Sequence, residues 1–385
     1  MDNPLDQSLQ ELMQKHQIVG LSAAVVKDNR LIWSNTYGKA DLERGQPVTG
    51  STVFRIASIS KTIAATALMQ LYEQALCKLD EDISNYLGFL VRNPRYPEHP
   101  VTLTYLLTHT SGLQDVYVDF VVASRTENPP TIHLREALLP EGRFYTDELW
   151  GELAPGDPAS YEYSNLGAVI IATIVESLSG ERFDQYCKRH IFKPLEMKDT
   201  SFHLRDIEDI NQVAVLYNYL PETGTYEVGT DAYRGVKPEG IDYSAYRPGT
   251  NGALFGPQGG LRSHAADLSL FMLAHLNQGT WNGVSILKSE TAKLMQQPHW
   301  SGYRREGFFK NAGLQFHITE DLIQGKRLIG HSGDAYGLLS CLYFHPEEQW
   351  GIIVIMNGLH QVKGQHVFFA AEEDLANFLY ESCVK

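Results

Sequence analysis

The sequence predicts an α/β (α+β) fold in which one sheet, flanked by helices, is built from both ends of the chain. Strand-like runs occupy 20–26 and 31–34 near the N-terminus, and four more lie between 313 and 356. Helix-like segments gather between these strand-rich ends, so the two ends are expected to share one sheet. The length of 385 residues is enough for two domains, or for one domain with a large insertion.

The N-terminal region predicts a helix followed by a hairpin. Residues Asp6 to Gln17 have their apolar side chains on one helical face. The two strand-like runs that follow are joined by Lys27-Asp28-Asn29-Arg30. Because two such runs separated by a short polar turn are typical of a β-hairpin, we expect the sheet to begin here.

The segment from Phe54 to Gln74 predicts a buried helix with a nucleophile at its start. Apolar residues recur at helical spacing after Ser58, so Ser58 and Lys61 are expected near the first turn and on one face. A serine hydroxyl is a poor nucleophile until a base lies beside it, and a poorly solvated lysine amine can be neutral enough to serve. The positive potential of the helix N-terminus would favour an oxyanion there. Ser-x-x-Lys alone is a weak signal, so the hypothesis needs other motifs.

The middle of the chain, from about 80 to 250, predicts helices and irregular segments. Helical patterns cover Leu103 to Leu107, Asn165 to Leu178 and Phe183 to Ile191. Two aromatic-rich stretches, 114–150 and 216–250, have no strong period. Long irregular segments of this kind are often lids or binding loops, although the tyrosines of the second stretch would equally suit a folded surface.

The last third of the chain is rich in predicted strands. A helix is expected from Ala266 to Leu276, and a closing helix from Val367 to Tyr380. The predicted strands between them are Gly313–Ile318, Arg327–Gly330, Leu338–Phe344 and Gly351–Met356.

Composition excludes several classes of function. The chain has 46 acidic and 32 basic residues, a formal charge of −14, which would repel nucleic acid and anionic membrane surfaces. No run approaches the roughly 20 apolar residues of a transmembrane helix, and the first 17 residues lack the basic and apolar regions of a secretory signal. Unless a leader was removed, we therefore expect a cytoplasmic protein.

The four cysteines lie far apart, so neither a zinc site nor a disulfide framework is predicted.

Two further motifs strengthen the hypothesis for Ser58. Tyr163-Ser164-Asn165 lies just before an apolar helix, and His331-Ser332-Gly333 follows the predicted strand Arg327–Gly330. With Ser58-Ile59-Ser60-Lys61, in this order and at these separations, they resemble the three signature elements of the serine β-lactamase and penicillin-binding-protein superfamily. The resemblance covers nearly the whole chain. Its class C branch, which includes D-alanyl-D-alanine carboxypeptidases, D-aminopeptidases and β-lactamase-like esterases, is further suggested by segments 54–62, 106–113, 193–197 and 259–263.

The resemblance implies a two-domain architecture. An antiparallel sheet flanked by helices would come from residues 1–80 and 251–385. A mainly helical domain, 81–250, would be inserted between these two parts. The active site would lie in the cleft between the two domains.

The resemblance also implies a role for each motif residue. Ser58 would be the nucleophile, and Lys61 would take its proton or hold the network that does. Tyr163 would act as general base and proton shuttle, provided that a nearby cation, for which Lys61 is the natural source, lowers the pKa of its phenol. Asn165 would hydrogen-bond Lys61 and the carbonyl of the substrate, or would only cap the following helix.

The third motif would form one edge of the cleft. His331, Ser332 and Gly333 would lie along an extended substrate, and the backbone N–H groups of Ser58 and Asp334 would form the oxyanion hole. His331 replaces the lysine of many relatives, so its attraction for a substrate carboxylate would be weaker and pH-dependent. Arg262 is a second candidate for contact with a carboxylate, and His109 is expected to stabilise a turn.

The function implied is a metal-independent serine hydrolase that needs no cofactor. Its expected substrate is a small amide or peptide, with a D-residue favoured, then a short ester, with β-lactams slow or incidental. An acyltransferase using the same residues and a non-catalytic ligand sensor or scaffold of the same fold stay open as alternatives. The sequence does not indicate an oligomeric state.

Overall fold

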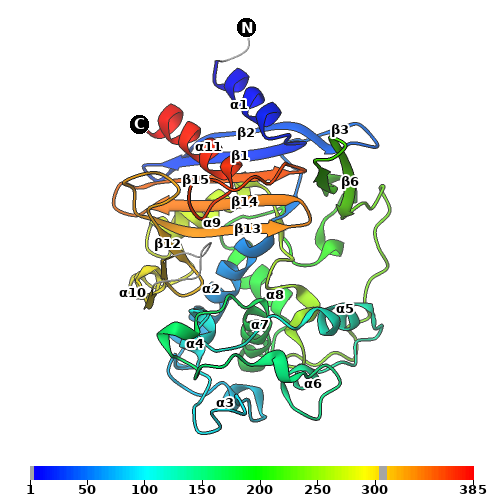
Figure 1. The fold of residues 1–385 in the computed structure, drawn as a ribbon, viewed down its shortest axis with the longest axis vertical. Coiled ribbons are helices and arrows are strands. Elements are labelled where there is room, and N and C mark those ends of the chain that lie inside the picture. The colour runs from blue at the N-terminus through cyan, green and yellow to red at the C-terminus, as the bar shows by residue number, and fades with distance from the viewer. Residues whose placement is uncertain (1–3, 303–309) are drawn as a thin grey trace.

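One antiparallel sheet dominates the upper half of the computed structural model, which describes residues 4–302 and 310–385 (Figure 1). Within these residues its strand order is β10-β11-β12-β13-β14-β15-β1-β2-β3. The two ends of the chain meet where β1 pairs with β15, from Gly20 opposite Asn357 to Lys27 opposite Trp350. The predicted sheet from both ends of the chain is therefore confirmed. Its strands are β1 (Gly20–Lys27), β2 (Arg30–Asp41), β3 (Gln46–Pro47), β10 (Trp300–Ser301), β11 (Asn311–Ala312), β12 (His317–Thr319), β13 (Leu328–Ala335), β14 (Leu338–His345) and β15 (Trp350–Asn357).

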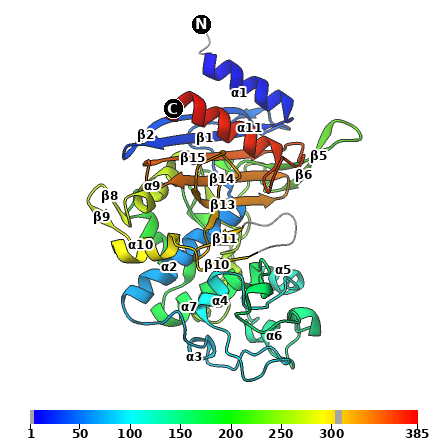
Figure 2. The same ribbon diagram turned by 60° about the vertical axis from the view of Figure 1, so that its left-hand side comes forward.

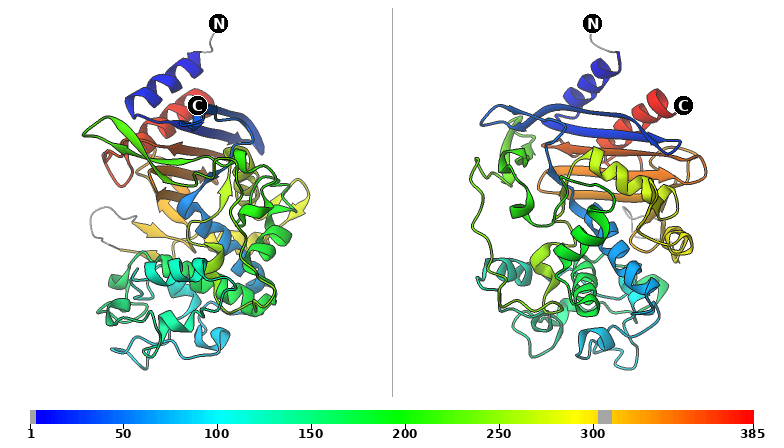
Figure 3. Two further views of the ribbon diagram at one scale, coloured as in Figure 1. Left: turned by 90° about the vertical axis from the view of Figure 1, so that its right-hand side faces the viewer. Right: turned by 180° about the vertical axis from the view of Figure 1, so that it is seen from behind.

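The central strands are buried on both faces because helices cover each side of the sheet. Every residue of β14 and β15 is buried. In β1 the side chains alternate: Ala23 and Val25 pack with α1 (Pro4–Lys15) and α11 (Ala370–Leu379), whereas Ala24 and Val26 pack into the core on the other face. Helix α9 (Ala265–Leu276) covers that second face, as the view from behind shows (Figure 3). The resulting layers run helix, sheet, helix.

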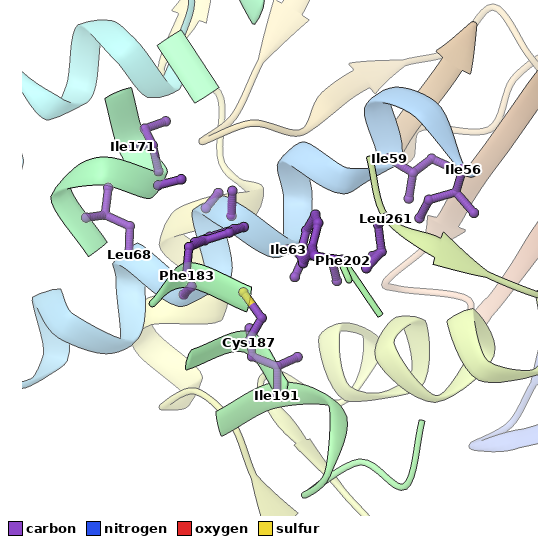
Figure 4. Close-up of a cluster of buried hydrophobic side chains, with 14 of the residues drawn as sticks. Ile56, Ile59, Ile63, Leu68, Ile171, Phe183, Cys187, Ile191, Phe202 and Leu261 are labelled. Carbon is purple, nitrogen blue, oxygen red and sulfur yellow. The ribbon is translucent and has the colours of Figure 1, made fainter. Parts of the chain in front are cut away.

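Helix α2 (Ser60–Glu73) is the central helix of the molecule, and a short 3₁₀ turn, Ala57–Ile59, leads into it. Every residue from Ser60 to Leu71 is buried. A helix that is covered all round is a core helix rather than a surface one. Figure 4 shows its apolar side chains packed between those of α7 (Asn165–Ser179) and of the segment around α8 (Phe183–Cys187). This packing fixes the start of α2 relative to the rest of the molecule.

The middle of the chain forms the lower half of the molecule (Figure 1). Its helices are α3 (Ser84–Leu87), α4 (Leu103–Leu107), α5 (Val118–Thr126), α6 (Arg135–Leu138), α7 and α8. The prediction that 216–250 is irregular is wrong in part. The stretch begins with a hairpin of β5 (Leu216–Leu220) and β6 (Thr225–Thr230). Aromatic and β-branched residues favour strands there, and Gly224 has the positive φ of +67° that the turn requires. The hairpin lies beside the edge of the main sheet (Figure 2). The division into two domains stays a prediction.

Three further groups of short elements complete the fold of the described residues. Strand β4 (Phe54–Arg55) pairs with β7 (Arg262–Ser263), and β8 (Thr280–Trp281) pairs with β9 (Val284–Ser285). Helix α10 (Ser289–Gln296) follows β9. Within the described parts of the chain, no helix combines the length and the apolar character needed to cross a bilayer.

Strand β13 differs from its prediction in a way that matters for the site. The expected strand ended at Gly330, but β13 continues to Ala335 and pairs with β14 throughout. On its other side β12 pairs with Leu328, Ile329 and Gly330 only. Among the described strands, none pairs with the outer edge of β13 from His331 to Ala335. His331, Ser332 and Gly333 therefore lie in a strand whose outer edge is unpaired within residues 4–302 and 310–385.

Candidate active site

Ser58 lies on a strained turn at the start of α2. The residue before it, Ala57, has a φ of +47°, a left-handed conformation that costs a non-glycine residue energy. Two contacts hold the turn in place: the Ser60 hydroxyl donates to Ala57 O at 2.6 Å, and Ile56 N donates to Leu261 O at 2.9 Å. The surrounding core thus fixes the position of Ser58, whose side chain is half-buried.

Lys61 is fully buried with its amine beside the Ser58 hydroxyl. The Lys61 Nζ lies 3.0 Å from Ser58 Oγ, 2.7 Å from Asn165 Oδ1 and 2.8 Å from Gln258 O. Burial lowers the pKa of Lys61 to about 7, against a smaller opposing contribution from Asp115. A neutral amine has two N–H donors and one lone pair. If the donors bind the amide oxygen of Asn165 and the carbonyl of Gln258, the lone pair is left to accept the proton of Ser58.

Tyr163 lies next to Lys61 and Ser58. The pKa of its phenol is raised, whereas we expected it to be lowered. The Lys61 Nζ lies 4.7 Å from the centroid of the phenol ring, over its face. Burial raises the pKa of the phenol well above its ordinary value, and the Ser58 hydroxyl opposes that shift only in part. The expectation that Lys61 lowers the pKa of Tyr163 is wrong, because Lys61 itself loses charge when buried. Tyr163 holds its proton at neutral pH, so Lys61 is the better base in the resting site.

Asn165 is oriented by an acidic residue that sequence reasoning missed. Asp115 accepts from the backbone N–H of Asn165 at 2.6 Å and from its side-chain Nδ2 at 2.5 Å. This contact turns the amide oxygen of Asn165 towards Lys61. The N-cap of α7 is Ser164, whose hydroxyl accepts from Gly167 N at 3.1 Å, so the alternative of Asn165 as a mere cap is wrong. No pattern marks Asp115 in the sequence, because it acts across a gap of 50 residues.

Asp115→Asn is expected to lower kcat/KM by about 10- to 100-fold, because a misplaced Asn165 no longer orients Lys61. The negative charge of Asp115 raises the pKa of Lys61. Its removal should therefore lower the pKa of Lys61 further, and the rise of kcat/KM with pH should move to lower pH. A pH profile of the variant measures this shift. An unchanged profile with reduced activity would mean that Asp115 acts only on the position of Asn165.

Strand β13 lies directly against the Ser58 turn. A Cβ atom at Gly333 would lie 2.6 Å from Ile56 O and 2.9 Å from the Cβ of Ala57, so only glycine allows this approach. The Ser340 hydroxyl also donates to Ile56 O at 2.9 Å. These contacts bring the backbone of Gly333 next to the turn that carries Ser58.

His331 is buried and neutral. Burial lowers its pKa to about 3, and the nearby Lys61 contributes in the same direction. Its Nδ1 lies 2.5 Å from Ser332 O and must donate to that carbonyl, so the Nε2 atom carries the lone pair. The His331 ring stacks on His317 at a centroid distance of 3.9 Å. At neutral pH the imidazole therefore has no charge, in line with the expectation of a weak attraction for a carboxylate, and the expected pH dependence lies in the acidic range.

The two other candidates serve structural roles. Arg262 is buried and binds Asp231 through Nη2 at 2.8 Å, so it does not reach a substrate as the sequence suggested. His109 stabilises a turn, as expected: it has a φ of +59°, and its Nδ1 accepts from Ser164 N at 3.1 Å. Its ring also packs on that of Tyr163, with a centroid distance of 4.5 Å.

A cavity of about 540 Å³ opens beside Ser58, of a size that suits a small molecule. Seven of the eight predicted site residues line it, and Lys61 lies behind Ser58. Sequence reasoning missed several other lining residues: Arg55, Tyr117, Arg125, Tyr161, Gln258, Tyr336 and Glu372. In residues 4–302 and 310–385, no group of three or more His, Cys, Asp or Glu side chains is arranged to hold a metal ion.

Comparisons with known proteins agree with the geometry. A family model described as Beta-lactamase matches residues 5–374. Penicillin-binding protein 4* of Bacillus subtilis (strain 168) is 27% identical over 265 residues, covering 68% of this chain and 52% of that protein. Esterase EstB of Burkholderia gladioli is 29% identical over 201 residues, covering 51% and 50%. The chain thus spans about half the length of these curated relatives. The D-amino acid amidase of Ochrobactrum anthropi SV3 has the same fold, with a TM-score of 0.70 at 21% identity over 98% of both chains.

Proposed function

This chain belongs to the beta-lactamase family, and from that premise we propose that it is a serine hydrolase that forms an acyl-enzyme on Ser58. One observation carries the proposal: the buried Lys61 amine lies 3.0 Å from Ser58 Oγ while oxygen atoms of Asn165 and Gln258 bind its other positions. A nucleophile within hydrogen-bond reach of a base, with the base oriented by a third group, is the arrangement of covalent catalysis.

In the acylation step, Ser58 Oγ attacks the substrate carbonyl and its proton passes to the Lys61 Nζ. The carbonyl oxygen becomes an oxyanion, for which the N–H groups of Ser58 and Asp334 are the proposed donors. When the bond to the leaving group breaks, the leaving atom takes the proton of the Tyr163 phenol, and the phenolate recovers a proton from Lys61. The raised pKa of Tyr163 supports this order, because the phenol begins the cycle protonated.

Deacylation repeats these transfers with water in place of Ser58. The amine of Lys61, neutral again, takes a proton directly from the attacking water. The ester bond to Ser58 Oγ breaks, the acid product leaves, and Oγ regains a proton from Lys61. Because Ser58 is half-buried and lines the cavity, water can approach the acyl group.

The free edge of β13 supports an extended substrate. Between His331 and Ala335 the strand offers backbone groups to the cavity, and no described strand pairs with that edge. A segment of substrate backbone can add to such an edge through main-chain hydrogen bonds. We therefore propose a small amide, peptide or ester as substrate. The names of two proteins of similar sequence or fold, an esterase and a D-amino acid amidase, support an ester or an amide with a D-residue.

Intact-protein mass spectrometry tests the nucleophile. The wild type is expected to gain the mass of one adduct from a fluorophosphonate and, separately, from a β-lactam, and Ser58→Ala should gain neither. Ser51→Ala, which changes another partly exposed serine, is the matched control and should react like the wild type. The rate at which the β-lactam adduct is lost reports the rate of deacylation. Absence of an adduct on the wild type with both probes would overturn the proposal.

A further inference from the structure

One end of the cavity carries an excess of positive charge. Arg55 and Arg125 line the cavity, and Arg262, which does not, shares the buried carboxylate of Asp231 with Arg55. Arg262 Nη2 lies 2.8 Å from Asp231 Oδ1, and Arg55 Nη2 lies 3.1 Å from the same atom. Both arginines bind the same oxygen, Oδ1, and Oδ2 has no hydrogen-bond partner among the described residues. In a chain with a formal charge of −14, this local excess of guanidinium groups is the reverse of the overall balance.

Arg125 is the guanidinium without an acidic partner among the described residues. Its Nε donates to Ala253 O at 3.1 Å, and its two Nη groups make no hydrogen bond within the parts of the chain that the structure covers. Burial, together with Arg55 and Arg262, lowers its pKa to about 10, so the side chain stays charged at neutral pH. A largely desolvated cation with open donors is unfavourable unless an anion reaches it.

An acidic residue, Glu372, also lines the cavity, but burial raises the pKa of its carboxyl to about 7, so it is only partly charged at neutral pH. Glu372 accepts a hydrogen bond from the Ser332 hydroxyl at 3.0 Å and lines the cavity beside it. Arg55 lies over the Tyr336 ring, 5.3 Å from its centroid, at the other end of β13. Ser332 and Ala335, the last residue of β13, are three residues or roughly 10 Å apart, and Tyr336 follows in the turn. A substrate with a single anionic group can thus place that group near Arg125 but not near Glu372.

We propose that Arg125 binds a carboxylate on the acyl part of the substrate, a proposal that rests on the serine hydrolase function. The leaving group must lie beside its proton donor, Tyr163, whose ring is 6.1 Å from that of His331. In the proposed orientation the acyl part lies along Asn165, Gln258 and Arg125, which line the same cavity.

The wall next to Arg125 indicates what joins the carboxylate to the reacting carbonyl. Val118 and Val122 line the cavity on α5, on the same helical face as Arg125, and are 61% and 56% exposed. Exposed apolar side chains that line a binding cavity favour an apolar segment of ligand. The substrate class is an ester or amide of a dicarboxylic acid whose second carboxylate lies at the end of a short hydrocarbon chain.

The test compares p-nitrophenyl esters that differ in one group. The p-nitrophenyl monoesters of adipic, pimelic and suberic acid carry a terminal carboxylate at three spacings, and each has a neutral counterpart in which an isopropyl group replaces that carboxylate. A 4-carboxyphenyl ester of a neutral acid places the anion on the leaving group instead. The wild type should prefer at least one anionic acyl ester by about tenfold or more in kcat/KM, as expected for a charge-assisted pair. The 4-carboxyphenyl ester should show no such gain.

Variants identify the residue. Arg125→Gln should abolish the preference, Arg125→Lys should retain part of it, and Arg125→Glu should favour an ester of 6-aminohexanoic acid. Arg143→Gln is the matched control, since Arg143 is 64% exposed in its side chain, pairs with Glu127 and does not line the cavity. Should Arg125→Gln fold poorly, Arg125→Lys decides instead, because a preference equal to that of the wild type in this variant would contradict a fitted guanidinium–carboxylate pair.

The outcomes separate this proposal from the hydrolase function. Hydrolysis of neutral and anionic esters at equal rates, dependent on Ser58, would overturn the proposal for Arg125 and leave the hydrolase intact. A preference that survives Arg125→Gln would likewise overturn it. Absence of Ser58-dependent reaction with any ester or acylating probe would overturn both.

Discussion

Replacing Lys61 with Met should reduce the rate of acylation by about 10²- to 10⁴-fold, the usual contribution of a positioned general base. Met is close to Lys in length and buries without charge, so the change removes the lone pair next to Ser58 Oγ and keeps most of the volume. Single-turnover measurements with an activated ester give the acylation rate directly. Lys293→Met on α10, which alters an exposed lysine, is the matched control and should acylate at the wild-type rate.

The dependence of kcat/KM on pH tests the role of Lys61 as a base more specifically than the loss of rate does. Burial lowers the pKa of Lys61 from its ordinary 10.5 to about 7, so the neutral form, which can accept a proton, accumulates as pH rises through 7. For the wild type, kcat/KM should increase between about pH 6 and 8 and then level off. In Lys61→Met that inflection should disappear together with the activity. An inflection that persists in the variant would assign the titration to another group and contradict the role of Lys61.

Replacing Asp231 with Ala should lower the free energy of unfolding by about 3–5 kcal/mol, the cost of leaving a buried charge without its partner. The loss would leave two guanidinium groups, Arg55 and Arg262, facing each other with no acid between them. Urea unfolding followed by fluorescence measures the change. Glu43→Ala is the control: Glu43 pairs with Arg234 at 3.0 Å, but both side chains are more than 60% exposed, so its loss should cost about 0–1 kcal/mol.

The contribution of Asp231 to the free energy of unfolding should decrease as the pH falls. The two arginines hold its pKa in the folded state well below the ordinary 3.8. A carboxyl group of this kind stabilises the fold fully above its unfolded pKa, and the stabilisation is lost as pH falls through the folded value. The difference in unfolding free energy between wild type and Asp231→Ala should thus be constant above about pH 5 and shrink below pH 4. A difference that grows on acidification would contradict this account.

Local patterns explain what the sequence could predict. Strands β14 and β15 are largely apolar runs, and α7 has both a cap and a terminal glycine. Short segments of sequence are therefore enough to predict that these elements form and whether each is a strand or a helix. The three motifs could be expected to meet because they resemble the signature elements of a known superfamily. In the structure Lys61 contacts both Ser58 and Asn165, which lie 3 and 104 residues away in the chain.

What the sequence could not predict depends on contacts between distant segments. Asp115 and Arg125 are ordinary charged residues in a stretch with no strong period, and only folding brings them to Asn165 and to the cavity. The pKa of Tyr163 could not be assigned either. The direction of its pKa shift depends on how far burial removes the charge of Lys61. No sequence motif encodes the extent of that burial. The end of β13 was placed too early because glycine and polar residues usually mark the end of a strand, whereas Gly333 allows this strand to lie against the Ser58 turn.

The pairing of β1 with β15 affects how the protein folds during its synthesis on the ribosome. The N-terminal hairpin is made first, but its β1 edge gains a neighbour only when Trp350 to Asn357 have been synthesised. Sheets closed by such distant segments form slowly, and an incomplete chain exposes an unpaired strand edge. The groups around Ser58 come from α2, α7 and β13, so they too assemble only late in synthesis. A nascent chain that stops before β15 has an open sheet and an edge that invites aggregation.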